Sequence, residues 1–172
     1  LVEGDETYTV ALATPGSTTG AAVALSATNF AVTTTIADND TATWSLSGET
    51  SVTEDPAVNN TASYTVSLGG TLQDLETASI VLSLTNGTTN TNGSDLATET
   101  EFDAAVATAV AAYNGGTDPG SLAYVAGTNT LTFTSDGTGA MGNLVIDLTA
   151  VNDLLVEGDE TYTVALATPG ST

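Results

Sequence analysis

The chain of 172 residues contains no lysine, arginine, histidine or cysteine. The absence of cysteine excludes a disulfide framework and any metal site built on thiolates. Against the missing basic residues stand 21 aspartates and glutamates, which give a formal net charge of -21. No carboxylate can form an ion pair with a basic side chain of this chain. Each must be solvated, accept a backbone N–H or bind a cation from outside.

These absences also exclude classes of function. Nucleic acids and anionic membrane surfaces are bound through Lys and Arg, so we expect no nucleic-acid partner and no direct membrane contact. General acid–base chemistry is reduced to paired carboxylates, as in glycoside hydrolysis. A sugar cleft also needs stacking aromatics, and most of the one Trp, five Tyr and three Phe fall at core-facing positions of the expected strands. We therefore expect that the protein is not an enzyme.

An eighteen-residue segment, LVEGDETYTVALATPGST, occurs twice without a single difference, at residues 1–18 and 155–172. Self-similarity at a fixed period indicates a repeat architecture. We expect a window on a longer tandem array, with a period of 154 residues. On this interpretation residues 1–37 are the last two strands of one module, residues 38–40 are a linker, and residues 41–172 are the first six strands of the next module.

Short runs of alternating apolar residues, separated by turn sequences such as EDPAVNN and TPGSTTG, predict β-strands with one buried face. Seven such strands per period predict an all-β fold, a seven-stranded antiparallel β-sandwich. The residues that define the runs are Trp44 and Leu46; Tyr64, Val66 and Leu68; Ile80, Leu82 and Leu84; Leu131 and Phe133; Leu144, Ile146 and Leu148; Tyr162, Val164 and Leu166 with their copies Tyr8, Val10 and Leu12; and Phe30, Val32, Thr34 and Ile36.

One segment has helical spacing instead. Thr98 and Glu101 form a capping-box pattern at its start, and Gly115 stands where a glycine often ends a helix. Phe102, Val106, Ala109, Val110 and Tyr113 lie between them at intervals of three and four residues. We predict one inserted helix at about 99–114, within a long connection over roughly 85–128. Its expected role is packing over an open edge or end of the sandwich.

The segment VEGDETYTVAL, followed by a strand and then DND, resembles the Calx-beta motif of the calcium-binding domains of sodium–calcium exchangers. Similar modules recur in the extender regions of giant bacterial RTX-type adhesins, and the helical insertion EFDAAVATAVAA is closer to those. The resemblance implies a seven-stranded Greek-key sandwich of Ig-like type. It also implies calcium (Ca2+) at one pole, held by the first inter-strand loop, the loop before the sixth strand and the acidic run after the seventh.

Carried over residue by residue, the resemblance implies a set of calcium ligands. Asn39 departs from the family pattern, which often has a third Asp there, so the site loses one charge. The candidate metal ligands are Glu54 in the first loop; Asp153, Glu157, Asp159 and Glu160 before the sixth strand; their copies Glu3, Asp5 and Glu6; and Asp38, Asn39 and Asp40 in the terminal run.

Elementary electrostatics supports the same expectation. In seven strands that alternate in direction, the first, third and fifth loops share a pole with the end of the seventh strand. Several carboxylates converging there without a cation would repel one another, and calcium takes about six to eight oxygen ligands. Magnesium prefers fewer protein ligands and keeps its waters. The alternative for any single carboxylate is an ordinary solvated surface residue. Asp74, Glu76 and Asp136 are expected at the opposite pole.

These observations favour a structural extender repeat of a large, secreted, calcium-dependent cell-surface adhesin. Calcium at module junctions would stiffen the array, which would project a distal binding domain for attachment or biofilm formation. The alternative is a carbohydrate- or surface-binding repeat, which a glycan array screened with calcium would separate. The expected partners are neighbouring copies of the same repeat, head to tail. Because residues 38–40 span only ~10 Å, we expect the strand at 30–36 to complete a neighbouring sandwich.

Overall fold

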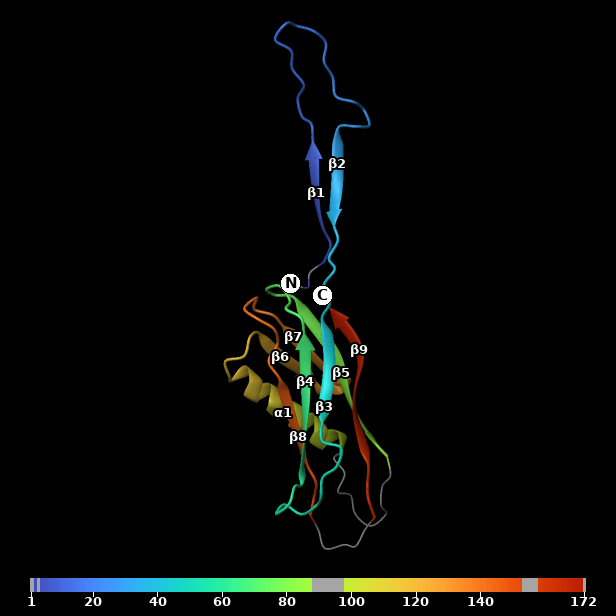
Figure 1. The fold of residues 1–172 in the computed structure, drawn as a ribbon, viewed down its shortest axis with the longest axis vertical. Coiled ribbons are helices and arrows are strands. Elements are labelled where there is room, and N and C mark those ends of the chain that lie inside the picture. Colours follow the sequence, from blue (N-terminus) through green and yellow to red (C-terminus); the bar gives the residue numbers. More distant parts are fainter. Residues whose placement is uncertain (1, 3, 88–97, 153–157, 172) are drawn as a thin grey trace. The chain divides into compact units, whose positions relative to one another are not determined.

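The computed structural model describes residues 2, 4–87, 98–152 and 158–171 (Figure 1). The chain divides into two compact units, of which one contains residues 41–172 and the other residues 2–40. The division falls directly after residues 38–40, and the assignment of the two units to successive repeat modules stays a prediction. Each unit is described by itself below.

The larger unit is built from antiparallel strands and one long helix. The described strands are β3 (Thr43–Gly48), β4 (Thr61–Gly69), β5 (Thr77–Asn86), β6 (Ser121–Val125), β7 (Thr130–Thr134), β8 (Leu144–Thr149) and β9 (Tyr162–Ser171). They form two sheets, one in the order β3-β4-β8 and the other in the order β6-β7-β5-β9. The helix α1 (Glu99–Asn114) and a short 3-10 turn η1 (Ala126–Thr128) complete the unit. The arrangement is that of an all-β sandwich with one helix.

The core lies between the two sheets and follows the alternation in the sequence. In β8 the side chains of Leu144, Ile146 and Leu148 are buried, whereas Val145 and Asp147 are exposed. The same period of two applies to every strand whose one face is covered. Val66 on β4, Leu82 on β5 and Leu131 on β7 are fully buried. The apolar runs therefore identified the inward face of the sandwich correctly.

The helix has the predicted bounds and the predicted start. The Thr98 Oγ1 accepts the N–H of Glu101, and the Glu101 carboxylate accepts the N–H of Thr98, so the capping box is present. Phe102, Val106 and Val110 are buried. They lie where α1 packs against β8 and β6, which are the edge strands of the two sheets. The helix therefore closes one open side of the sandwich (Figure 1).

One strand was not expected. The predicted connection at 85–128 contains β6 as well as the helix, so the described residues of the whole chain form nine strands rather than the eight apolar runs seen in the sequence. Leu122 is buried on β6, and Tyr124 donates a hydrogen bond to Asp103 of α1. β6 pairs with β7 from Ser121↔Thr134 to Val125↔Thr130. The strand protects an edge of β7 that would otherwise be unpaired.

The smaller unit is a two-stranded antiparallel hairpin, formed by β1 (Glu6–Ala11) and β2 (Ala31–Ile36). A long connection joins the two strands, which are drawn in blue in Figure 1. Both strands were predicted, and they pair from Glu6↔Ile36 to Ala11↔Ala31. None of the described residues in this unit is buried. None of the helices among the described residues has the length and apolar character needed to cross a lipid bilayer.

Candidate functional site

The acidic residues of the hairpin unit gather at the base of β1 and β2. The Asp5 Oδ1 accepts the backbone N–H of Asp38 at 2.9 Å, and the Asp38 Oδ1 accepts the N–H of Asp40 at 3.2 Å. Asn39 lies between the two aspartates and is exposed. Glu6 lies on β1 opposite Ile36. The structure thus brings Asp5 and the run 38–40 together through hydrogen bonds from backbone N–H groups to aspartate side chains, as is common where carboxylates order a turn.

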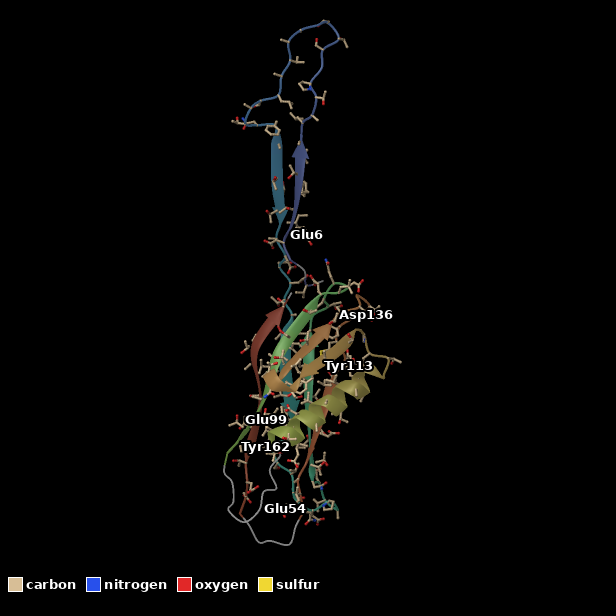
Figure 2. All side chains as sticks on the ribbon, turned by 180° about the vertical axis from the view of Figure 1, so that it is seen from behind. Glu6, Glu54, Glu99, Tyr113, Asp136 and Tyr162 are labelled. Atoms are coloured by element: carbon tan, nitrogen blue, oxygen red, sulfur yellow. The ribbon has the colours of Figure 1, made fainter. Side chains whose placement is uncertain are left out.

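In the sandwich unit the candidate ligands come from two loops at one end. β4 begins where β8 ends, because Ala150 donates its N–H to the carbonyl of Asn60 at 2.7 Å. The described residues 49–60, 150–152 and 158–161 therefore lie toward this end. Glu54 is half-buried in the first loop, Glu160 is half-buried and Asp159 is exposed. Figure 2 labels Glu54 toward this end and Asp136 toward the other. Three predicted ligands, Glu3, Asp153 and Glu157, lie outside the described residues.

Within the described ranges, no group of three or more acidic side chains is close enough to hold a metal ion. The fit to calcium therefore depends on the chemistry of the donor set. Carboxylate and carbonyl oxygens are the ligands that this ion takes, and no lysine or arginine competes for them. The ligands predicted for the sandwich unit are Glu54, Asp159 and Glu160 with Asp153 and Glu157, of which the last two lie outside the described residues, and calcium binding by this set stays a prediction.

The opposite end of the sandwich has its own acidic residues, which are already engaged by the backbone. The pKa of Asp136 is lowered to about 2 because its carboxylate accepts the N–H of Gly120 and both the N–H and hydroxyl of Thr138. Glu76 accepts the N–H of Gln73 at 3.0 Å. These contacts order the turns at this end. Asp136 and Glu76 therefore have a structural role, because their carboxylates accept hydrogen bonds that hold these turns.

The second candidate site is the duplicated strand, since β1 and β9 have the same sequence in different surroundings. In β9 the ring of Tyr162 meets that of Tyr64 from the other sheet, with centroids 6.3 Å apart in an edge-to-face arrangement. The Tyr64 hydroxyl donates a hydrogen bond to the Tyr162 hydroxyl at 3.0 Å. Burial, followed by this hydrogen bond, raises the pKa of Tyr64. In β1 the corresponding Tyr8 is 52% exposed.

The hairpin has one apolar face and one threonine face. Thr9 and Thr33 are opposite each other on the polar face, with their hydroxyl oxygens 2.7 Å apart. Large apolar side chains on the other face have no described neighbour that buries them. They are Tyr8 (52% exposed), Val10 (64%), Leu12 (64%), Phe30 (45%), Val32 (67%) and Ile36 (55%). A contiguous exposed face of this kind marks an interaction surface in a soluble protein.

Comparison with known proteins adds no relative to this description. No family model, no curated protein and no solved structure matches the chain.

Proposed function

We propose that the chain is a structural extender repeat of a tandem array. The observation that carries this proposal is the duplicated segment, which is a core-facing strand in one copy and half of an exposed apolar hairpin in the other. An apolar face without a core is what a repeat module has when its neighbour supplies the rest of the sandwich. The module proposed is the seven-stranded Greek-key sandwich, in which a strand of the β2 type stands beside β9.

The larger setting of the repeat rests on the Calx-beta resemblance and on the acidic composition. We place it in a large, secreted cell-surface adhesin, where it acts as a non-enzymatic spacer and its partners are further copies of itself. Calcium at the ends of the modules is the proposed stiffening agent. Support comes from the net charge of -21, which no basic residue offsets. A cation shared between two modules would remove part of that repulsion.

The test is calorimetric titration of calcium into a protein that spans two complete periods. Ions that bind only the folded state stabilise it by ~2.7 kcal/mol per site at a hundredfold excess over the dissociation constant. Unfolding should therefore shift to clearly higher temperature in millimolar calcium. Equal melting temperatures in calcium and in a chelator would remove the calcium part of the proposal.

A matched pair of variants separates a site from overall charge. Glu157→Gln should weaken calcium affinity more than Asp147→Asn, although each removes one charge. Asp147 is exposed on β8, where it accepts a hydrogen bond from the Ser63 hydroxyl at 2.6 Å, and it is not one of the candidate ligands. Equal effects of the two substitutions would mean that the total charge, and no defined site, attracts the ion.

A further inference from the structure

The two sides of the sandwich are closed differently. On one side α1 packs against the edge strands β8 and β6. On the other side the edge strands are β3 and β9, which lie near each other (Figure 1). No described helix or strand of the sandwich unit pairs with the outer edge of either one. Trp44 and Leu46 of β3 are half-buried, whereas their register partners Leu68 and Val66 on β4 are buried.

The backbone of β9 has a defined open edge. Gly87, which follows β5, donates its N–H to the carbonyl of Thr161 at 2.7 Å, so the odd-numbered residues from 161 to 165 face β5. Successive residues of a strand direct their backbone groups to opposite edges. The N–H and C=O groups of Tyr162, Val164 and Leu166 therefore point away from β5, toward the open edge.

In β1, the other copy of the duplicated segment, the equivalent edge binds β2. Leu12 donates its N–H to the carbonyl of Phe30 at 2.8 Å, and Val10 and Tyr8 lie opposite Val32 and Thr34. Leu12 and Leu166 are equivalent positions of the duplicated segment. The residues through which β1 binds β2 are therefore those whose backbone groups β9 leaves open.

We infer that β2 of a second copy of this chain binds the open edge of β9, in the register that it has with β1. Thr34 then lies opposite Tyr162, Val32 opposite Val164, and Phe30 beside Leu166. Residues directly opposite in an antiparallel pair share a face, so Val32 and Phe30 enter the sandwich interior next to β3. This inference rests on the proposed repeat function, since the same edge is where the next repeat of an array would supply its strand.

Burial of apolar side chains favours the transfer of β2 from β1 to β9. The backbone hydrogen bonds do not favour either state, because β2 forms the same bonds with both strands. β2 gives up backbone bonds to β1 and forms the same bonds to an identical sequence. Its apolar residues Phe30 and Val32, which are 45% and 67% exposed in the hairpin, come to lie beside β3, where Trp44 and Leu46 are half-buried. β9 stays in place, because displacing it would break the Tyr64–Tyr162 contact and uncover the core.

The test is a register-specific disulfide between two different chains. Because the protein has no cysteine of its own, only the introduced cysteines can form a disulfide. A Thr33→Cys chain is mixed with a Thr163→Cys chain that carries a mass tag, and the mixture is oxidised in chelator at physiological salt. Thr33 lies opposite Thr9, the equivalent of Thr163, at a non-hydrogen-bonded position. Such pairs have Cα atoms about 4.5 Å apart, within the range of a disulfide. The matched control replaces Thr163→Cys with Thr161→Cys, two residues out of register.

We expect the mixed disulfide with Thr163→Cys to exceed that with Thr161→Cys by about fivefold or more. In the inferred register Thr161 is a diagonal neighbour of Thr33, and such neighbours are about 7–8 Å apart, at the limit of what a disulfide can span. Association of the unmodified chain in sedimentation should be abolished by Val32→Asp and kept by Thr35→Asp, which adds the same charge on the threonine face. Both residues are exposed in the hairpin, so neither change should unfold it.

The inference would be overturned by equal yields of the two disulfides, by a monomer at all concentrations, or by equal effects of the two aspartate substitutions. Insertion of an intact β1–β2 hairpin in place of β9 would also overturn it, because Thr33 would then lie beside Thr9 of its own chain. A failure here is separable from a failure of the proposed function. The disulfide test runs without calcium on this chain, whereas the calcium titration uses two complete periods.

Discussion

The strands β1 and β9 are one sequence in two environments. Tyr162 in β9 packs on Tyr64 and shares a hydrogen bond with it. Tyr8, its copy in β1, is 52% exposed, and Val10 is 64% exposed. The alternation of apolar and polar residues thus determines which face of a strand is apolar, whereas an opposing sheet determines whether that face is buried. Local sequence makes the strand, and the rest of the fold makes the core.

The strand ends differ for the same reason. β9 extends to Ser171 because β5 runs alongside it as far as the pair Ala78↔Ser171. β1 ends at Ala11, and the copies of the last residues of β9 belong to an irregular connection. A strand continues only as far as a partner offers it hydrogen bonds. The extent of the strand is therefore decided by its neighbour.

Truncation of the same tyrosine in each copy should show the difference between β9 and β1 most clearly. Tyr162→Ala should lower the unfolding free energy of the sandwich by ~2–3 kcal/mol, somewhat less than for a fully buried aromatic residue, because Tyr162 is half-buried. Tyr8→Ala should change it by less than about 0.5 kcal/mol. Urea unfolding followed by Trp44 fluorescence measures both. Similar losses in the two variants would show that β1 is also part of a packed core.

Alkaline pH should weaken the tyrosine contact that only β9 makes. Burial and the bond to Tyr162 raise the pKa of Tyr64 above its ordinary value of 10.0. The folded state then holds this proton more tightly than the unfolded state, so the stabilisation is present below pH 10 and is lost as the pH rises above it. The urea midpoint should fall above pH 10, and Tyr64→Phe should reduce that fall.

The reduction in Tyr64→Phe should be partial, because burial also raises the pKa of Tyr113 and of Tyr124, the latter hydrogen-bonded to Asp103. Tyr8→Phe is the matched control and should leave the alkaline fall unchanged. A fall that is the same in Tyr64→Phe as in the unmodified chain would contradict this account.

Replacing the same tyrosines with phenylalanine tests the contribution of one hydroxyl group in each copy. Tyr162→Phe keeps the ring but removes the oxygen that accepts the Tyr64 O–H, which should reduce the unfolding free energy by about 1 kcal/mol. Tyr8→Phe removes an exposed hydroxyl and should have no measurable effect. Thermal unfolding of both variants gives the answer. If Tyr162→Phe is neutral, the contact between the rings, rather than the hydrogen bond, holds β9 to the opposite sheet.

The smallest expected effect concerns the acidic residue that precedes each copy of the strand. Asp5→Asn should speed hydrogen exchange of the Asp38 amide about threefold, because a neutral amide oxygen accepts a weaker hydrogen bond than a carboxylate. Asp159→Asn, the equivalent change beside β9, should leave that amide unchanged. Equal acceleration by both substitutions would mean that overall charge, and not the Asp5 contact, protects Asp38.

The sequence alone predicted the helix and the inward face of the core strands, and it marked residues 38–40 as a polar break. Each depends on local signals: the capping pair Thr98 and Glu101, alternation within a strand, and a short polar run. It missed β6, because Leu122 and Tyr124 give only two alternating positions next to the strand that follows. The candidate calcium ligands remain a prediction. Their convergence depends on loops whose paths are set by contacts across the whole fold, and Asp153 and Glu157 lie outside the described residues.

What the sequence determined by itself is visible in what the two copies share. Thr14 and Thr168 are equivalent, and both adopt a positive φ, at 39° and 52°, before the same Pro-Gly pair. Both copies also form a strand through the same tyrosine, valine and alanine. The shared strand follows from short-range alternation. The shared positive φ is sterically unfavourable for a β-branched residue, yet it accompanies the same local sequence in two different surroundings. Only the tertiary structure decided that Tyr162 is packed while Tyr8 is exposed, because burial requires a second surface that the eighteen residues do not contain.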